Sequence, residues 1–172
     1  MKRYALALLA LLGACDDGTV ITHTDRLVAI SMRDLVVMTS GGGIPTEIHG
    51  TPFAGAAPAD LAGALRPPAR ASQATRWRAV APGGRDHGTR MVLHFNSAGP
   101  PNSARDCRLT APAETGPPQE TGFRVTLTFC KGEIWQATGY LQARKTEAGD
   151  WEEYTRVMRV LLAAIFIEEP DR

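Results

Sequence analysis

Two neighbouring segments alternate apolar and polar residues in the manner of a β-hairpin. Over Phe123–Cys130 the odd-numbered residues are apolar, and over Ile134–Ala143 they are apolar or glycine. This period of two is typical of half-buried strands. Because opposed residues of antiparallel strands share a face, we expect Phe129 to lie opposite Trp135, which requires a three-residue loop at Lys131–Glu133.

Three shorter segments are also predicted to be strands. Met91–Phe95 alternates cleanly, which places His94 on the face opposite Leu93. Thr46–His49 follows three consecutive glycines, which break the chain. Leu27–Met38 is apolar and partly alternating, so we expect a strand there and keep a helix as the alternative.

Two segments have the signals of helices. Pro58–Leu65 begins with proline, which suits the first turn, and two consecutive prolines follow it at residues 67–68. The second helix is predicted to start after Asp150, because Glu153 stands three positions later as in a capping box. Apolar residues then follow at helical spacing and define one buried stripe: Tyr154, Val157, Met158, Leu161 and Ile165.

These elements predict an α+β domain, with an antiparallel sheet of four to five strands and both helices packed on one face. The chain of 172 residues accommodates one such domain, which we place at residues 26–172. Residues 66–90 show little periodicity and are expected to be a long loop. A domain of this length buries enough apolar surface to be stable without a cofactor.

The N-terminus has the pattern of an export signal. Lys2 and Arg3 precede nine apolar residues, too few to span a bilayer. The following Leu12–Cys15 (Leu-Gly-Ala-Cys) resembles the lipobox of bacterial lipoproteins. The resemblance implies a signal peptide at residues 1–14, cleavage before Cys15, diacylglycerol on its thiol and usually a fatty acyl chain such as palmitate on its amine. An ordinary cleavable signal is the alternative, but it would place a bulky leucine at the −3 position.

The residues after the lipobox bear on localisation. We expect residues 15–25 to form the lipid anchor and a tether to the domain. Asp16 and Asp17 resemble the inner-membrane retention signal of enteric lipoproteins. The predicted location is therefore the periplasmic side of the inner membrane, with the outer membrane as the alternative.

Three cysteines would leave one thiol over in an exported protein. Lipidation of Cys15 removes this anomaly and leaves Cys107 and Cys130, which an oxidising periplasm favours as a disulfide. Two buried free thiols are the alternative. No CxxC pair or spaced histidine cluster accompanies these cysteines to indicate a metal site.

The sequence has no specific catalytic motif: GxSxG, HExxH, a P-loop and GxGxxG are all missing. The neighbouring Asp86 and His87 are the only histidine and acid side by side, in a predicted loop. They make a periplasmic hydrolase or metal-dependent enzyme the alternative function, with the histidine as base and the acid as its orienter. Without an evident nucleophile, we expect that the protein is not an enzyme.

Charge is unevenly distributed along the chain. The formal net charge of +1 indicates no nucleic-acid partner. Residues 66–105, however, contain seven arginines and a single acid, Asp86. One hypothesis is a basic surface toward anionic lipid, cell-wall polymer or an acidic envelope protein, with an aromatic anchor; the other is a set of solubilising loops. The surface would comprise Arg66, Arg70, Arg76, Trp77, Arg78, Arg85 and Arg90, with Arg105 as the seventh arginine.

Three segments, Glu47–Phe53, Met91–Phe95 and Phe129–Gly132, resemble a group of small proteobacterial lipoproteins. This resemblance implies neither an activity nor site residues. We therefore expect a lipid-anchored periplasmic protein with a non-catalytic domain that binds a small ligand or another envelope component.

Overall fold

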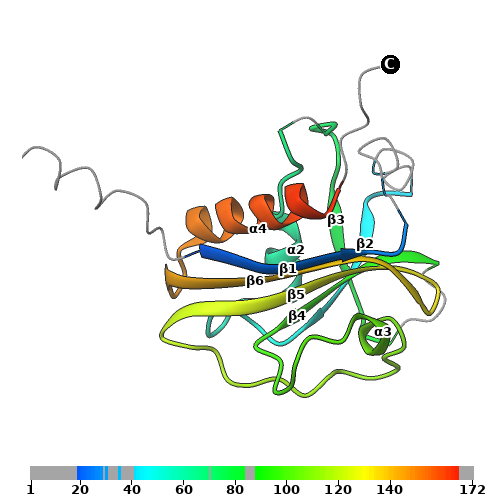
Figure 1. Cartoon of the computed structure of the whole chain (residues 1–172). Helices are drawn as coiled ribbons and strands as arrows, with labels where there is room; N and C mark the ends of the chain where they lie inside the picture. The colour runs from blue at the N-terminus through cyan, green and yellow to red at the C-terminus, as the bar shows by residue number, and fades with distance from the viewer. Residues whose placement is uncertain are drawn as a thin grey trace, which may run out of the picture.

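The computed structural model describes residues 19–28, 30, 35, 41–69, 71–83 and 88–166. One six-stranded sheet, in the order β1-β6-β5-β4-β2-β3, forms the centre of the molecule (Figure 1). Its strands are β1 (Thr19–Arg26), β2 (Ile44–His49), β3 (Trp77–Val80), β4 (Thr89–Phe95), β5 (Thr121–Lys131) and β6 (Ile134–Glu147). The helices within these ranges are α2 (Pro58–Ala64), α3 (Ser103–Asp106) and α4 (Trp151–Ile165).

The α+β class is confirmed, but the sheet is mixed rather than antiparallel and has more strands than expected. β2 pairs in parallel with both β3 and β4, whereas β4, β5, β6 and β1 pair antiparallel in succession. The connection from β2 to β3 contains α2, and a crossover of this kind joins parallel neighbours. Periodicity reports which face a side chain occupies and carries no information about strand direction.

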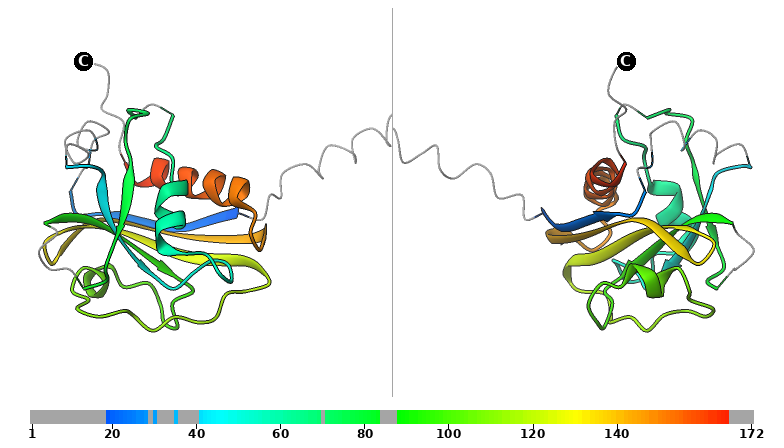
Figure 2. Two further views of the ribbon diagram at one scale, coloured as in Figure 1. Left: turned by 180° about the vertical axis from the view of Figure 1, so that it is seen from behind. Right: turned by 45° about the vertical axis from the view of Figure 1, so that its right-hand side comes forward.

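α4 and α2 cover the same face of the sheet, as predicted, and enclose the hydrophobic core (Figure 2). Met91, Leu93 and Phe95 of β4 are buried there with the apolar stripe of α4. The N-terminus of α4 has the predicted cap: an Asp150 side-chain oxygen accepts the Glu153 N–H at 2.9 Å. α4 also packs so closely on β6 that a Cβ at Gly139 would lie 2.8 Å from Leu161 Cδ1.

The hairpin of β5 and β6 has a different register from the predicted one. Phe129 pairs with Ala137 and Lys131 pairs with Ile134, so the turn contains two residues rather than three. An irregularity between Phe129 and Cys130 places Trp135 opposite Cys130, on the other face of the sheet. The apolar residues of the two strands still share the inner face of the sheet, as expected, but a β-bulge brings them there rather than a three-residue loop.

Three further expectations need correction or fall outside the described ranges. Most of the expected tether is in fact β1, which pairs with β6 at the edge of the sheet. The expected loop over residues 66–90 contains β3, where buried Trp77 pairs with Ile44. Most of the expected strand at Leu27–Met38 lies outside the described residues.

Within the described ranges, no helix has the length and apolar character needed to cross a bilayer.

Candidate functional site

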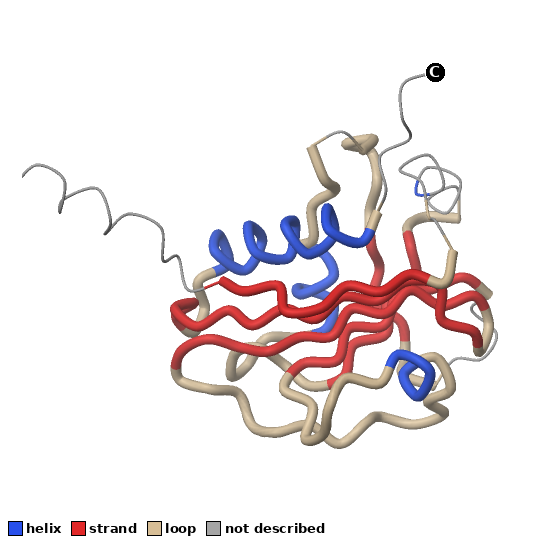
Figure 3. The backbone as a smooth tube through the Cα atoms, in the orientation of Figure 1, coloured by secondary structure: helices blue, strands red, loops and turns tan. Residues whose placement is uncertain are grey.

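The second face of the sheet is polar and is covered by the long connection between β4 and β5, which includes α3 (Figure 3). Cys107, directly after α3, forms a disulfide with Cys130 of β5, with Cα atoms 5.6 Å apart. This confirms the predicted disulfide. Val92 and Trp135 pack around it in a small apolar cluster. The disulfide therefore fastens the covering segment to the polar face of the sheet.

A buried ion pair links the covering segment, β4 and β2. Arg90 is 1% exposed, and its Nε lies 2.6 Å from Oε1 of Glu47, which is fully buried. The other two guanidinium nitrogens donate to the carbonyl oxygens of Gly132 at 2.7 Å and Cys107 at 2.8 Å. Arg90 thus joins two strands, a turn and the residue after α3. Its expected place on a basic surface is wrong, because the side chain is buried, its charge is paired with Glu47 and its two terminal nitrogens donate inside the fold.

Glu47 is held in its ionised form by its surroundings. Burial raises its pKa, but a ring N–H of His49, the backbone N–H of Gly83 and the charge of Arg90 outweigh this and lower the pKa below the ordinary value. The ring orientation fits, because His49 Nδ1 accepts the Ala113 N–H at 3.0 Å, which leaves the hydrogen on Nε2, 3.7 Å from Glu47 Oε2. The second histidine of this face, His94, has its ring centre 5.8 Å from that of His49.

His94 and Asp106 form a second buried polar pair. His94 Nδ1 lies 3.1 Å from Asp106 Oδ1, and the other carboxylate oxygen accepts from the Thr128 hydroxyl at 3.3 Å. His94 Nε2 lies 3.4 Å from the Glu114 carbonyl oxygen. Both partners of the ring, a carboxylate and a backbone carbonyl, belong to the protein itself, so both ring nitrogens are engaged inside the fold. An Asp–His pair is also part of catalytic triads, but here the second ring nitrogen faces a backbone carbonyl rather than a nucleophile.

Asn96 shapes the segment that follows β4. It is buried and has a positive φ of 47°, which asparagine tolerates better than most residues. Its side chain donates to the Thr51 carbonyl oxygen at 3.1 Å and accepts the Arg124 N–H at 3.1 Å. These bonds fix the direction of the chain into residues 97–101.

Residues 97–101 form one wall of a pocket of about 260 Å³ on the polar face. The opposite wall comes from β4, β5 and β6. Five side chains bring polar groups to the lining: His94, Ser97, Arg124, Thr126 and Tyr140. Ser97, Arg124, Thr126 and Tyr140 can donate a hydrogen bond to a ligand, whereas both ring nitrogens of His94 face acceptors of the protein itself. No carboxylate is among the lining residues that the structure describes. The pocket therefore has the chemistry of a site for an anion.

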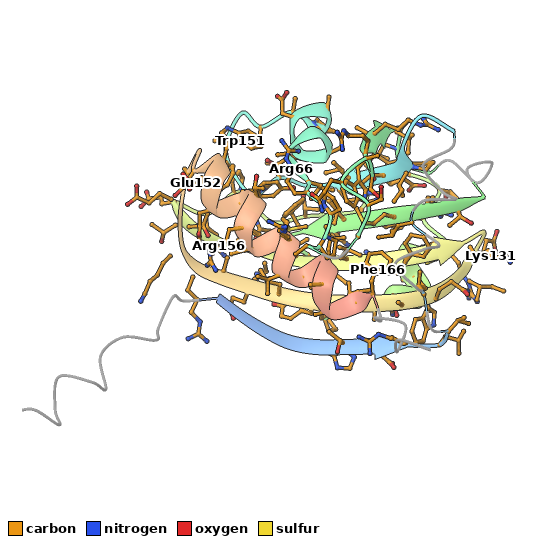
Figure 4. The ribbon with its side chains drawn as sticks, turned by 90° about the horizontal axis from the view of Figure 1, so that it is seen from above. Arg66, Lys131, Trp151, Glu152, Arg156 and Phe166 are labelled. Carbon is orange, nitrogen blue, oxygen red and sulfur yellow. A yellow bond between two sulfur atoms is a disulfide. The ribbon has the colours of Figure 1, made fainter. Side chains whose placement is uncertain are left out.

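The arginine-rich segment is only partly exposed. Arg66, Arg76, Arg78 and Arg105 are exposed, and Figure 4 labels Arg66 beyond the end of α2. In two of them a guanidinium nitrogen donates to nearby backbone carbonyls. Arg66 donates to the carbonyls of Gly63 and Leu65. Arg76 donates to those of Gln73 and Thr75. Trp77, expected as an aromatic anchor, is instead 6% exposed within the core. A basic surface thus excludes both Trp77 and Arg90.

The other predicted site residues lie outside the described ranges: Cys15, Arg70, Arg85, Asp86 and His87. The pocket and the His94–Asp106 pair were missed from the sequence. The only available signal was that His94 falls on the polar face of a strand, and Asp106 is distant in the chain. Among the described residues, no group of three or more His, Cys, Asp or Glu side chains is arranged to hold a metal ion.

Comparison with known proteins adds no functional assignment. No family model matches this chain, and neither a curated protein nor a solved structure shows significant similarity to it.

Proposed function

We propose that this protein is an exported, lipid-anchored domain that binds a small anionic ligand in the pocket beside His94 and does not catalyse a reaction. The single observation that carries the proposal is the composition of the pocket lining: among the described residues it has four side chains free to donate to a ligand and no carboxylate. Its volume, about 260 Å³, is just below the usual range for drug-sized ligands, so the ligand is small. The export signal and the lipobox support the proposed location in the bacterial envelope.

The charges around the pocket favour a ligand with a single negative charge. Arg124 supplies an exposed guanidinium, suited to a carboxylate or phosphate. Asp106 does not line the pocket and is engaged by His94 and Thr128. No carboxylate among the described lining residues therefore neutralises the charge of Arg124 at the pocket surface.

The test is calorimetric titration of the soluble domain with acetate, succinate, inorganic phosphate and, as the neutral control, glycerol. At least one anion should bind saturably and glycerol should not. Arg124→Gln should weaken binding tenfold or more, because a hydrogen bond to a charged group contributes about 1.5–3 kcal/mol. The matched control is Arg144→Gln, at an exposed arginine of β6 outside the pocket. No saturable anion binding, or equal effects of the two variants, would refute the proposal.

The alternative function, a hydrolase or metal-dependent enzyme using Asp86 and His87, stays a prediction. Both residues lie outside the described ranges. Replacing His87 with alanine and assaying ester and phosphoester hydrolysis distinguishes the two functions, because a binding domain shows no activity in either protein.

A further inference from the structure

The chain between the proposed lipid anchor and the sheet is very short. β1 begins at Thr19, so only residues 16–18 separate it from Cys15. Whatever conformation these residues take, four steps along the chain span at most about 14 Å. We propose that the domain has no free tether and rests with one end of its sheet in the lipid headgroup layer of the anchoring membrane. This inference depends on the lipid anchor at Cys15 proposed above.

The register of β1 and β6 identifies which end faces the membrane. Thr19 pairs with Ala143, and β6 runs on to Glu147 in the direction from which the chain enters β1. Four residues of an antiparallel strand rise about 14 Å. The turn between β6 and α4 therefore extends about as far past Thr19 as Cys15 can reach. With the cysteine at the membrane surface, this turn lies at the level of the headgroups.

The first residue of α4 gives this end an interfacial side chain. Trp151 is 37% exposed, and its ring packs edge-on against Phe53 and Tyr154, with ring centres 5.8 Å apart in each case. Figure 4 shows Trp151 and Glu152 at the same end of the molecule as the start of β1. Tryptophan held in this way, with one edge packed and another exposed, suits the boundary between lipid tails and water.

The charges near Trp151 indicate which lipids this end contacts. Among the residues that the structure describes at this end, Glu147, Asp150 and Glu152 are exposed, as are Arg144 and Lys145, so this set has one more acidic than basic side chain. Anionic headgroups would be repelled weakly rather than attracted. The contact we propose is therefore with zwitterionic headgroups, through the tryptophan ring.

The exposed arginines near β3 lie at the opposite corner of the sheet. β3 and β1 are the two edge strands. Following the pairings from strand to strand places Thr46 of β2 level with Arg26, the last residue of β1. β2 starts two residues before Thr46, at Ile44, and Ile44 pairs with Trp77 of β3. Arg76 and Arg78, on either side of Trp77, are therefore diagonally opposite Thr19. In the proposed orientation an anionic partner of these arginines is a periplasmic component rather than the anchoring bilayer.

The test measures tryptophan fluorescence of the full lipidated protein in phosphatidylcholine vesicles, with and without brominated acyl chains, which quench nearby indole rings. Brominated lipid should quench the emission, and Trp151→Phe should remove most of the quenching. Insertion of a ten-residue Gly-Ser linker after Asp17 should also reduce it, while the protein stays in the vesicle fraction. Replacing part of the lipid with anionic phosphatidylglycerol should not increase it.

Two outcomes distinguish this inference from the anchor on which it depends. If the wild-type protein floats with the vesicles but Trp151 is not quenched, or is quenched equally with the inserted linker, the seated orientation is refuted and the anchor stands. If the wild-type protein carries no lipid and does not float, the anchor itself is refuted and the inference with it.

Discussion

Replacing Arg90 with methionine should destabilise the fold severely, since it leaves the Glu47 carboxylate buried without its counter-charge. The two side chains are 2% and 0% exposed, and their closest atoms are 2.6 Å apart. Removing one partner of a buried ion pair typically costs about 3–5 kcal/mol. Two hydrogen bonds to carbonyl oxygens are lost as well. Against a typical domain stability of about 5–15 kcal/mol, the variant should be close to unfolding.

Urea denaturation followed by circular dichroism measures this loss, with Arg108→Met as the matched control. Arg108 is exposed beside α3, so its replacement should change the free energy of unfolding by no more than about 0.5 kcal/mol. The double variant Glu47→Gln with Arg90→Met removes both charges and should be more stable than the sum of the single effects predicts. Coupling between contacting residues is about 0.5–3 kcal/mol, so additivity within 0.5 kcal/mol would refute the ion-pair argument.

The loss should also depend on pH. The pKa of Glu47 lies below its ordinary value in the folded protein. Its stabilising contribution is therefore complete above the ordinary value, about 4.3, and is lost as the pH falls through the folded-state pKa. Without Arg90 that pKa rises, so the destabilisation by Arg90→Met should be smaller at pH 4 than at pH 7. An equal loss at both pH values would show that the charge pair is not its cause.

Three further results are expected. Cys107→Ser should lower the free energy of unfolding by about 3 kcal/mol, since the disulfide spans 23 residues, and the melting temperature should then not respond to reductant; a further drop on reduction would contradict this. Gly139→Ala should lower the free energy of unfolding by about 1–3 kcal/mol, because the added Cβ overpacks against α4. Gly63→Ala is the control and should not destabilise, since a Cβ there meets nothing within 4 Å; equal melting temperatures of the two variants would contradict the packing argument. Cys15→Ser should leave uncleaved precursor and abolish labelling by a clickable fatty acid, and surviving label would refute the lipoprotein hypothesis.

Local patterns were sufficient for the elements whose faces differ in polarity. The alternation in β4 and β5 correctly placed Met91 and Leu93 in the core and His94 on the other face. The stripe and the cap of α4 were equally readable, because both are properties of residues three or four apart. The disulfide followed from counting the cysteines of a chain predicted to be exported and needed no geometry.

Strand neighbours and strand direction were decided by tertiary structure. β1 comes from a polar segment that looks like a tether, and it is a strand because it pairs with β6. Trp135 was placed on the wrong face because the bulge that shifts it depends on pairing with β5. Such pairings are set by contacts between residues distant in the chain, and a period of two in one strand says nothing about them.

The polar site was likewise invisible in the sequence. Arg90 stands in an arginine-rich segment, where solvent exposure is the natural expectation, yet it is buried because Glu47, 43 positions earlier, lies on the neighbouring strand. His94 pairs with Asp106, which lies beside it because α3 covers that face of the sheet and the disulfide fastens α3 there. A charged side chain is buried only where the fold brings it a partner. Sequence alone therefore determined which faces are apolar, and the tertiary structure decided which polar groups meet.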